Sequence, residues 1–213
     1  MIAAVVPVGT LAGAKSRLRP ELSDASLEQL VLRMLEDVLN ALLEVDALAR
    51  VAVVTPDADV AHCARATGAD ALLYTEPGLN PAIEWAGRQV APDAKDGLLV
   101  VLGDVPSARA EELAELIESV QAPGVALAPA NDGGTAALYR APREVIPAAF
   151  GSQSASAHRT HAERAGIALR ELPLPSLSLD LDEPSDVEKF LAGPSGGERT
   201  RAFLHEIGAG AKT

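Results

Sequence analysis

Apolar residues along the chain follow two periodicities. Short continuous aliphatic runs are typical of strands buried on both faces of a parallel sheet, and they occur at residues 2–8, 51–55, 69–73 and 98–102. Between them, apolar residues recur every three or four positions, which predicts amphipathic helices at residues 27–42, 58–67, 81–90 and 108–120. This alternation predicts an α/β fold: a single-domain, mostly parallel, doubly wound sheet flanked by helices.

The second half of the chain has a weaker pattern. Residues 124–128 and 136–139 predict two strands around a turn at residues 131–134, and residues 178–181 predict one more, so we expect a mixed sheet here. A last helix is predicted at residues 198–207. We therefore expect one domain over residues 1–207 and a flexible tail at 208–213.

Capping residues define three of the predicted helix boundaries. Ser23 or Asp24 is suited to cap the first helix, and Gly68 is suited to end the second. Asn80 is suited to cap the third helix, because Pro81 would then occupy the favoured first helical position.

The composition fits one globular domain and excludes several kinds of partner. The chain has 213 residues, 48% hydrophobic and 3% aromatic, which is enough for one aliphatic core. Its formal net charge of -12 repels nucleic acids. Residues 2–8 are too few to span a bilayer and lack the charged start of a signal peptide. The single cysteine, Cys63, excludes an internal disulfide and a cysteine-only metal cage. We expect a cytoplasmic protein with no nucleic-acid or membrane partner, and a homo-oligomer stays open.

The loop after the first predicted strand, residues 7–19, is the clearest candidate for an anion site. It is rich in small residues and carries three cations within five positions, Lys15, Arg17 and Arg19. Backbone N–H groups of such a loop can cradle phosphates, with Lys15 as a point charge and Arg17 as a bidentate fork. The loop lacks the Gly-Lys pair of a Walker A motif and the spacing of a dinucleotide fingerprint. A solvated basic loop is the alternative.

Three carboxylates are candidates for a metal site. Asp104 follows the buried strand at residues 98–102, and ligands of parallel sheets bind outside the carboxyl ends of strands. Asp180 and Asp182 lie two apart on one extended segment, and if that segment is a strand they share one face, where both could meet a hard cation. The alternatives are a turn role for Asp104 and helix capping for the other two.

Two segments rich in Gly and Ser are candidates for binding an anionic second substrate. Residues 132–135 predict a turn that ends in the hydroxyl of Thr135, and residues 150–158 run into a predicted helix. N–H groups, hydroxyls and a helix N-terminus all suit such a ligand. Ordinary turns explain both segments equally well.

Covalent catalysis and a zinc site have little support in the sequence. The G-x-S-x-G elbow of serine hydrolases does not occur. His158 and His161 lie three apart on a predicted helix but lack a partnered carboxylate motif, and His62 beside Cys63 is more typical of packing.

In their order and spacing, these motifs resemble the CofC/FbiD family, guanylyltransferases that make the precursor of the deazaflavin coenzyme F-420. The family belongs to the GT-A-like nucleotidyltransferases, so the resemblance implies a Rossmann-like, GT-A-type sheet. It covers nearly the whole chain. The matching stretches are residues 7–18, 78–80, 103–106, 134–136, 150–151 with Ser154 and His158, and 180–184.

The resemblance implies Mg²⁺-dependent transfer of GMP from GTP to the phosphate of a three-carbon acid, with release of pyrophosphate. Lys15, Arg17 and Asp104 would be catalytic. The nucleotide would contact Pro7, Val8, Gly9, Gly13, Lys15, Arg17, Gly78 and Asn80. The metal would be held by Asp104 and by one or both of Asp180 and Asp182, and the acceptor by Thr135, Gly151 and Ser154.

Two departures from the family pattern affect these expectations. Gly9 stands where many relatives carry a basic residue, which leaves the charge to Lys15 and Arg17, with Arg19 as a further candidate. Ser152-Gln153 replaces the common Pro-Asp or Pro-Gly of the acceptor loop. Phosphoenolpyruvate, 2-phospho-L-lactate and 3-phosphoglycerate are all acceptors within the family.

Two other functions are compatible with the same motifs. Another GT-A-like transferase, a glycosyltransferase or a molybdenum-cofactor nucleotidyltransferase, would share the first loop and the metal carboxylates but take a different acceptor. A non-catalytic nucleotide-binding domain would bind GTP without turnover.

Overall fold

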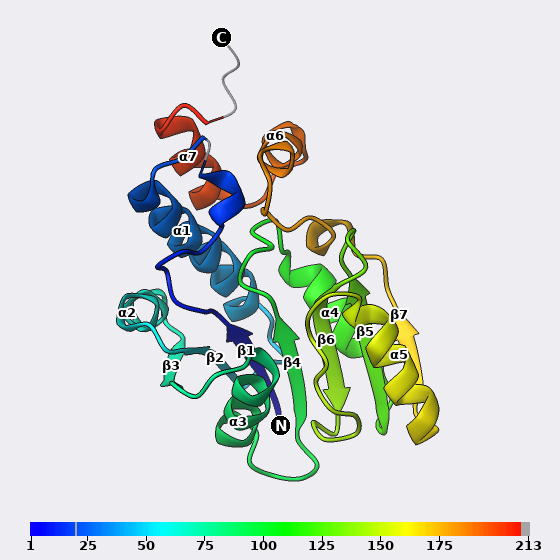
Figure 1. The fold of residues 1–213 in the computed structure, drawn as a ribbon. Coiled ribbons are helices and arrows are strands. Elements are labelled where there is room, and N and C mark those ends of the chain that lie inside the picture. Colours follow the sequence, from blue (N-terminus) through cyan, green and yellow to red (C-terminus); the bar gives the residue numbers. More distant parts are fainter. Residues whose placement is uncertain (20, 210–213) are drawn as a thin grey trace.

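Seven strands form one mixed sheet in the computed structural model, which describes residues 1–19 and 21–209 (Figure 1). Their spatial order is β3-β2-β1-β4-β6-β5-β7. β6 runs antiparallel to both of its neighbours, and every other neighbouring pair is parallel. The strands are β1 (Ile2–Pro7), β2 (Arg50–Thr55), β3 (Asp70–Leu73), β4 (Gly97–Val101), β5 (Gly124–Pro129), β6 (Thr135–Ala141) and β7 (Ala168–Glu171).

Helices cover both faces of this sheet. One face packs against α1, α2 and α4, and the other against α3 and α5, because side chains of each strand alternate between two separate hydrophobic clusters. The helices are α1 (Asp24–Leu43), α2 (Ala58–Thr67), α3 (Leu79–Val90), α4 (Ala110–Glu118), α5 (Ser154–Ala165), α6 (Pro184–Ala192) and α7 (Glu198–Glu206), with short 3₁₀ turns at Ser16–Leu18 and Pro175–Leu177. The predicted mainly parallel, doubly wound α/β sheet is confirmed.

Two of the three predicted caps are confirmed and one is wrong. The Ser23 hydroxyl accepts a hydrogen bond from the Ser26 N–H, and Gly68 ends α2 with φ 105°. Asn80 does not cap α3, because the helix begins at Leu79 with Gly78 as its N-cap. The Asn80 side chain is instead bonded to the backbone of Phe150.

The C-terminal part of the sheet differs from prediction. Residues 178–181 form no strand, and they make isolated backbone bonds such as Leu181 N–H to Asp104 C=O rather than a ladder. The strand at this edge of the sheet is β7, which sequence reasoning missed because its four residues are largely exposed and lack an apolar run. The predicted tail lies mostly outside the described residues. No helix in the described part is long and apolar enough to cross a membrane.

Candidate active site

The loop after β1 brings Lys15 toward the carboxyl ends of the central strands. The loop is tied to the start of α2 by the Leu11 N–H, which donates to Asp57 Oδ2 at 3.0 Å. Lys15 has φ 50°, a left-handed conformation that costs energy for a residue other than glycine. Such strain persists where the surrounding contacts fix it, and here two carboxylates bind the side chain.

Asp104, Asp180 and Asp182 form what we call the carboxylate cluster. One oxygen of each lies within 4.8 Å of the others, although the three residues come from two distant segments. Lys15 Nζ donates to Asp104 Oδ2 at 2.8 Å and to Asp182 Oδ1 at 2.5 Å. The three carboxylates therefore retain an excess of two negative charges over the single ammonium.

The electrostatics of this cluster suit a divalent cation. Burial by itself would lower the pKa of Lys15, but Asp104 and Asp182 outweigh it and raise that pKa. Burial and then the charge of Asp104 raise the pKa of Asp180. Asp104 Oδ1 is buried and has no hydrogen-bond partner among the described residues. An orphaned carboxylate oxygen beside two further carboxylates matches the oxygen ligands that Mg²⁺ prefers.

Two cavities lie beside the first loop. One, of about 460 Å³, is lined by Gly13, Lys15 and Asp104, and the other, of about 420 Å³, by Gly78. Pro7, Val8 and Gly9 line both. Six of the eight residues expected at the nucleotide therefore surround this space.

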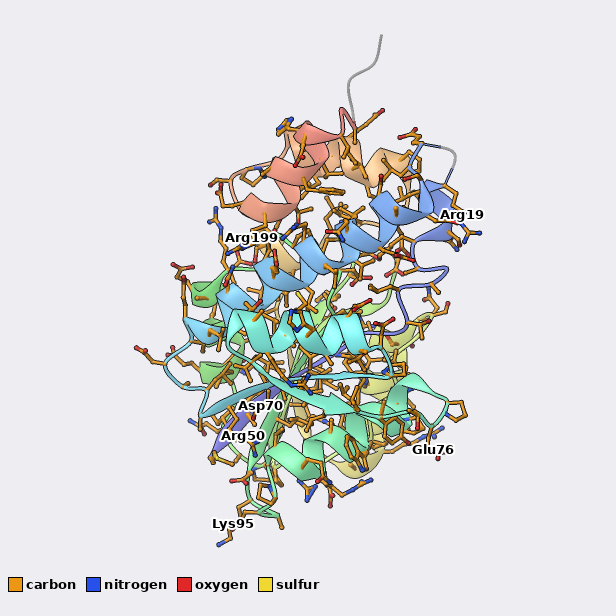
Figure 2. All side chains as sticks on the ribbon, turned by 90° about the vertical axis from the view of Figure 1, so that its left-hand side faces the viewer. Arg19, Arg50, Asp70, Glu76, Lys95 and Arg199 are labelled. Atoms are coloured by element: carbon orange, nitrogen blue, oxygen red, sulfur yellow. The ribbon has the colours of Figure 1, made fainter. Side chains whose placement is uncertain are left out.

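Arg17 and Asn80, the other two, line neither cavity. The Arg17 guanidinium is largely exposed, and its Nη1 lies 3.5 Å from Glu183 Oε1. The third cation of the loop, Arg19, pairs with Asp24 on the outer surface at the start of α1 (Figure 2). Of the three cations, Lys15 alone contacts the carboxylate cluster.

Thr135, Ser154 and His158 form a second group, the hydroxyl cluster. All three are at most 2% exposed. Thr135 Oγ1 lies 3.0 Å from both His158 Nδ1 and Ser154 Oγ. Burial, followed by the charges of Arg140 and His161, lowers the pKa of His158 to about 4, so the imidazole is neutral near pH 7. Gly151, the third residue expected at the acceptor, is exposed and has φ 133°, and no atom beyond its chain neighbours lies within 4 Å of the position that a Cβ would take.

Sequence reasoning missed the role of His158 in this cluster. The signal was its spacing from Ser154, because residues four apart on a helix share one face. It was weighed as a zinc ligand with His161, but no group of ligands in the described residues includes either histidine.

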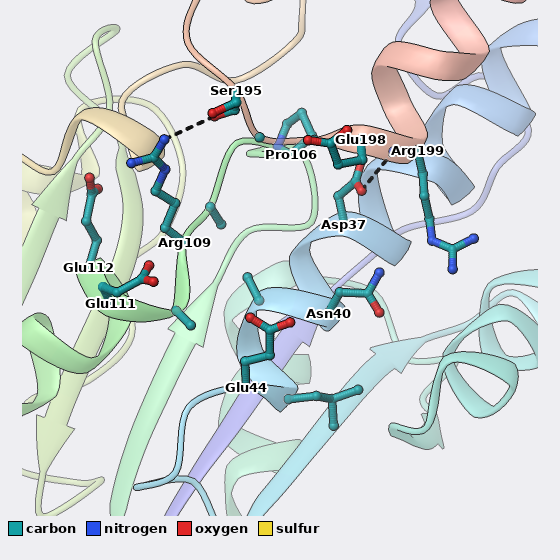
Figure 3. Close-up of a pocket in the computed structure, with 16 residues that line it drawn as sticks. Asp37, Asn40, Glu44, Pro106, Arg109, Glu111, Glu112, Ser195, Glu198 and Arg199 are labelled. Atoms are coloured by element: carbon teal, nitrogen blue, oxygen red, sulfur yellow. Dashed lines mark hydrogen bonds between the residues drawn. The ribbon is translucent and has the colours of Figure 1, made fainter.

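Another cavity, of about 830 Å³, lies between α1, α4 and the start of α7, and no residue of either cluster lines it (Figure 3). Its buried carboxylate, Asp37, accepts hydrogen bonds from the N–H groups of Arg199 and Thr200 and from the Thr200 hydroxyl. Asp37 therefore satisfies the N-terminus of α7, which is a structural role.

The fold is one that solved nucleotidyltransferases share. A proposed nucleotide-diphospho-sugar transferase from Desulfovibrio desulfuricans G20 superposes with a TM-score of 0.81 at 19% identity, covering 98% of this chain and 95% of that one. A nucleotidyl transferase from Methanothermobacter thermautotroptrophicus gives 0.68 at 19% identity, covering 97% and 99%. At these identities the likeness is one of fold.

Sequence comparison gives the family. The model described as "Guanylyl transferase CofC like" matches residues 2–213. The phosphoenolpyruvate guanylyltransferase of Sphaerobacter thermophilus is 39% identical over 191 residues, which is 89% of this chain and 92% of that protein. The 3-phospho-D-glycerate guanylyltransferase of Phenylobacterium zucineum is 37% identical over 214 residues, 97% of each chain. The chain belongs to the CofC-like guanylyltransferase family.

Proposed function

We propose that this enzyme transfers GMP from GTP to the phosphate of a three-carbon phospho-acid in a Mg²⁺-dependent reaction that releases pyrophosphate, as a step towards coenzyme F-420. The observation that carries the proposal is the carboxylate cluster with its buried, unpartnered Asp104 Oδ1. Asp104 of this cluster lines the first-loop cavity of about 460 Å³, where a triphosphate would meet Lys15 and backbone N–H groups.

Phosphoenolpyruvate is our first choice of acceptor. The Sphaerobacter thermophilus relative is named for it, whereas the Phenylobacterium zucineum relative is named for 3-phospho-D-glycerate. The neutral, hydrogen-bonding groups of the hydroxyl cluster suit the oxygens of any such acid. 2-Phospho-L-lactate and 3-phosphoglycerate are therefore the competing substrates to test.

The reaction needs positioning and charge neutralisation rather than a protein nucleophile. An oxygen of the acceptor phosphate attacks the α-phosphorus of GTP, the new P–O bond forms in line, and the bond to the β-phosphate breaks to release pyrophosphate. Lys15 would neutralise charge on the phosphates, and the first-loop N–H groups would orient them. Asp104 with one or both of Asp180 and Asp182 would hold Mg²⁺, which when bound supplies further positive charge at the triphosphate.

Pyrophosphate release tests this proposal. Each of the four nucleoside triphosphates is incubated with Mg²⁺ and each of the three acids, and products are identified by mass. We expect release with GTP and one acid, and a product in which GMP is joined to that acid. If no pair of nucleotide and acid releases pyrophosphate while GTP still binds, the transferase function would be contradicted and a non-catalytic nucleotide-binding role favoured.

A further inference from the structure

The loop between β6 and α5 is held by side chains rather than by a neighbouring strand. Three successive N–H groups, those of residues 148, 149 and 150, donate to side chains of α3 and α5. The acceptors are Glu84 Oε1 at 2.7 Å, His158 Nε2 at 3.0 Å and Asn80 Oδ1 at 2.7 Å. Because no ladder partner fixes this segment, its geometry depends on these three side chains.

The base of this arrangement is a buried ion pair. Arg140 is fully buried, and its Nη1 donates to Glu84 Oε1 at 2.6 Å and to the carbonyl of Ile146 at 2.9 Å. Glu84 thus receives bonds from Arg140 and from the Ala148 N–H on one oxygen. A charge-assisted pair of this kind fixes the carboxylate in one orientation under the loop.

His158 joins this segment to the hydroxyl cluster. The Ala149 N–H donates to Nε2, so Nε2 carries a lone pair and the proton of the neutral ring lies on Nδ1. Nδ1–H then donates to Thr135 Oγ1, which also accepts from the Ser154 hydroxyl. Both of these bonds use lone pairs of Thr135 Oγ1, and the Thr135 hydroxyl hydrogen has no acceptor among the described residues, although the residue is only 1% exposed.

Asn80 joins the same segment to the nucleotide side of the site. Its Oδ1 accepts from the Phe150 N–H, and its Nδ2 donates to the Phe150 carbonyl at 3.0 Å. Asn80 lies two residues after Gly78, which lines a first-loop cavity. Its partner Phe150 directly precedes the exposed Gly151. Because the Asn80 side chain both accepts from and donates to the Phe150 backbone, the distance between the Gly78 and Gly151 regions has little freedom to change.

We propose that Asn80 and His158 are positioning residues that fix the loop at residues 148–150 before substrates bind, so that Gly151, Thr135 and Ser154 meet the acceptor at a set distance from the nucleotide. This inference rests on the proposed function. It assigns Asn80 to the acceptor side through Phe150, rather than to direct contact with the nucleotide.

A matched pair of variants separates the two bonds of His158. In His158→Gln the side-chain oxygen can replace Nε2 and keep the Ala149 bond, whereas in His158→Asn the amide nitrogen can replace Nδ1 and keep the Thr135 bond. Asn80→Ala removes both bonds to Phe150, and since Asn80 is only part-buried it provides a test even if the His158 variants fold poorly.

Two readouts decide the proposal. In ligand-free protein, hydrogen exchange at the amides of residues 148–150 should be slow in the wild type, fast at Phe150 in Asn80→Ala, and fast at Ala149 in His158→Asn but not in His158→Gln. In kinetics with GTP and phosphoenolpyruvate, Asn80→Ala should raise the KM of the acceptor about tenfold and that of GTP less than about twofold.

Unchanged exchange in Asn80→Ala, or an equal rise in both KM values, would overturn the positioning role. A wild-type protein that turns over no phospho-acid would refute the proposed function and the acceptor role together. The exchange data would still show separately whether the side chains hold the loop.

Discussion

The carboxylate cluster and the hydroxyl cluster differ in charge, in burial and in how far their hydrogen bonds are satisfied. Asp104, Asp180 and Asp182 are half-buried, carry excess negative charge and leave one buried oxygen without a partner among the described residues. Thr135, Ser154 and His158 are buried, neutral and bonded to one another. The first arrangement gains stability when a cation binds, whereas the second is already organised without a ligand. This difference is why we propose that charge chemistry and acceptor positioning are divided between the two clusters.

Asp104→Asn should give the largest effect, because it removes a charge from the carboxylate cluster and leaves the hydroxyl cluster untouched. We expect Mg²⁺-dependent turnover to fall by at least about 10³-fold while the protein stays folded. Asp70→Asn is the matched control, since Asp70 forms an exposed pair with Arg50 on the face shown in Figure 2. Near-normal turnover in Asp104→Asn, measured by pyrophosphate release, would contradict the assignment of Asp104 as a metal ligand.

Lys15→Met should separate catalysis from metal affinity. Removing the ammonium leaves the carboxylates uncompensated, so ligand-free protein should bind Mn²⁺ about tenfold more tightly by calorimetry. Turnover should nevertheless fall about 10²-fold, because the phosphates lose a positive partner. Weaker Mn²⁺ binding in the variant would contradict the view that Lys15 competes with a cation.

Thr135→Ala should affect the two substrates unequally. It removes the hydroxyl on which the other two members of the hydroxyl cluster converge, so the KM of the acceptor should rise about tenfold while that of GTP changes little. Thr135→Ser, which keeps the hydroxyl, is the matched control and should stay close to wild type. Equal losses for both substrates would argue against a division between the clusters.

Acid should destabilise the protein through His158. Its pKa is about 4 in the folded protein against roughly 6.5 when unfolded, so protons bind the unfolded chain more readily. The contribution to stability is therefore present above pH 6.5 and lost as pH falls through 4, by about 3 kcal/mol between pH 7 and pH 4. Denaturant unfolding of wild type and His158→Gln at both values isolates this effect, and the same pH dependence in both would contradict it.

The features that the sequence predicted correctly are those set by residues close to one another along the chain. The central strands and α1 were found because continuous or periodic apolar runs are local signals, and Asp104 was singled out because it follows a buried strand. Residues 178–181 were wrongly read as a strand, because Leu179 and Leu181 pack into the core without any ladder. The bonds from Asn80 and Glu84 to the loop at residues 148–150 span more than 60 positions, and no local pattern reports such contacts.

The position of the bound metal is the most direct test of whether charge chemistry belongs to the carboxylate cluster. A crystal grown with Mn²⁺ and a non-hydrolysable GTP analogue would reveal the ion by anomalous scattering. We expect Mn²⁺ bound by Asp104 together with Asp180, Asp182 or both, with Lys15 moved from the carboxylates to the phosphates. Manganese bound elsewhere, with Lys15 still bridging Asp104 and Asp182, would contradict it.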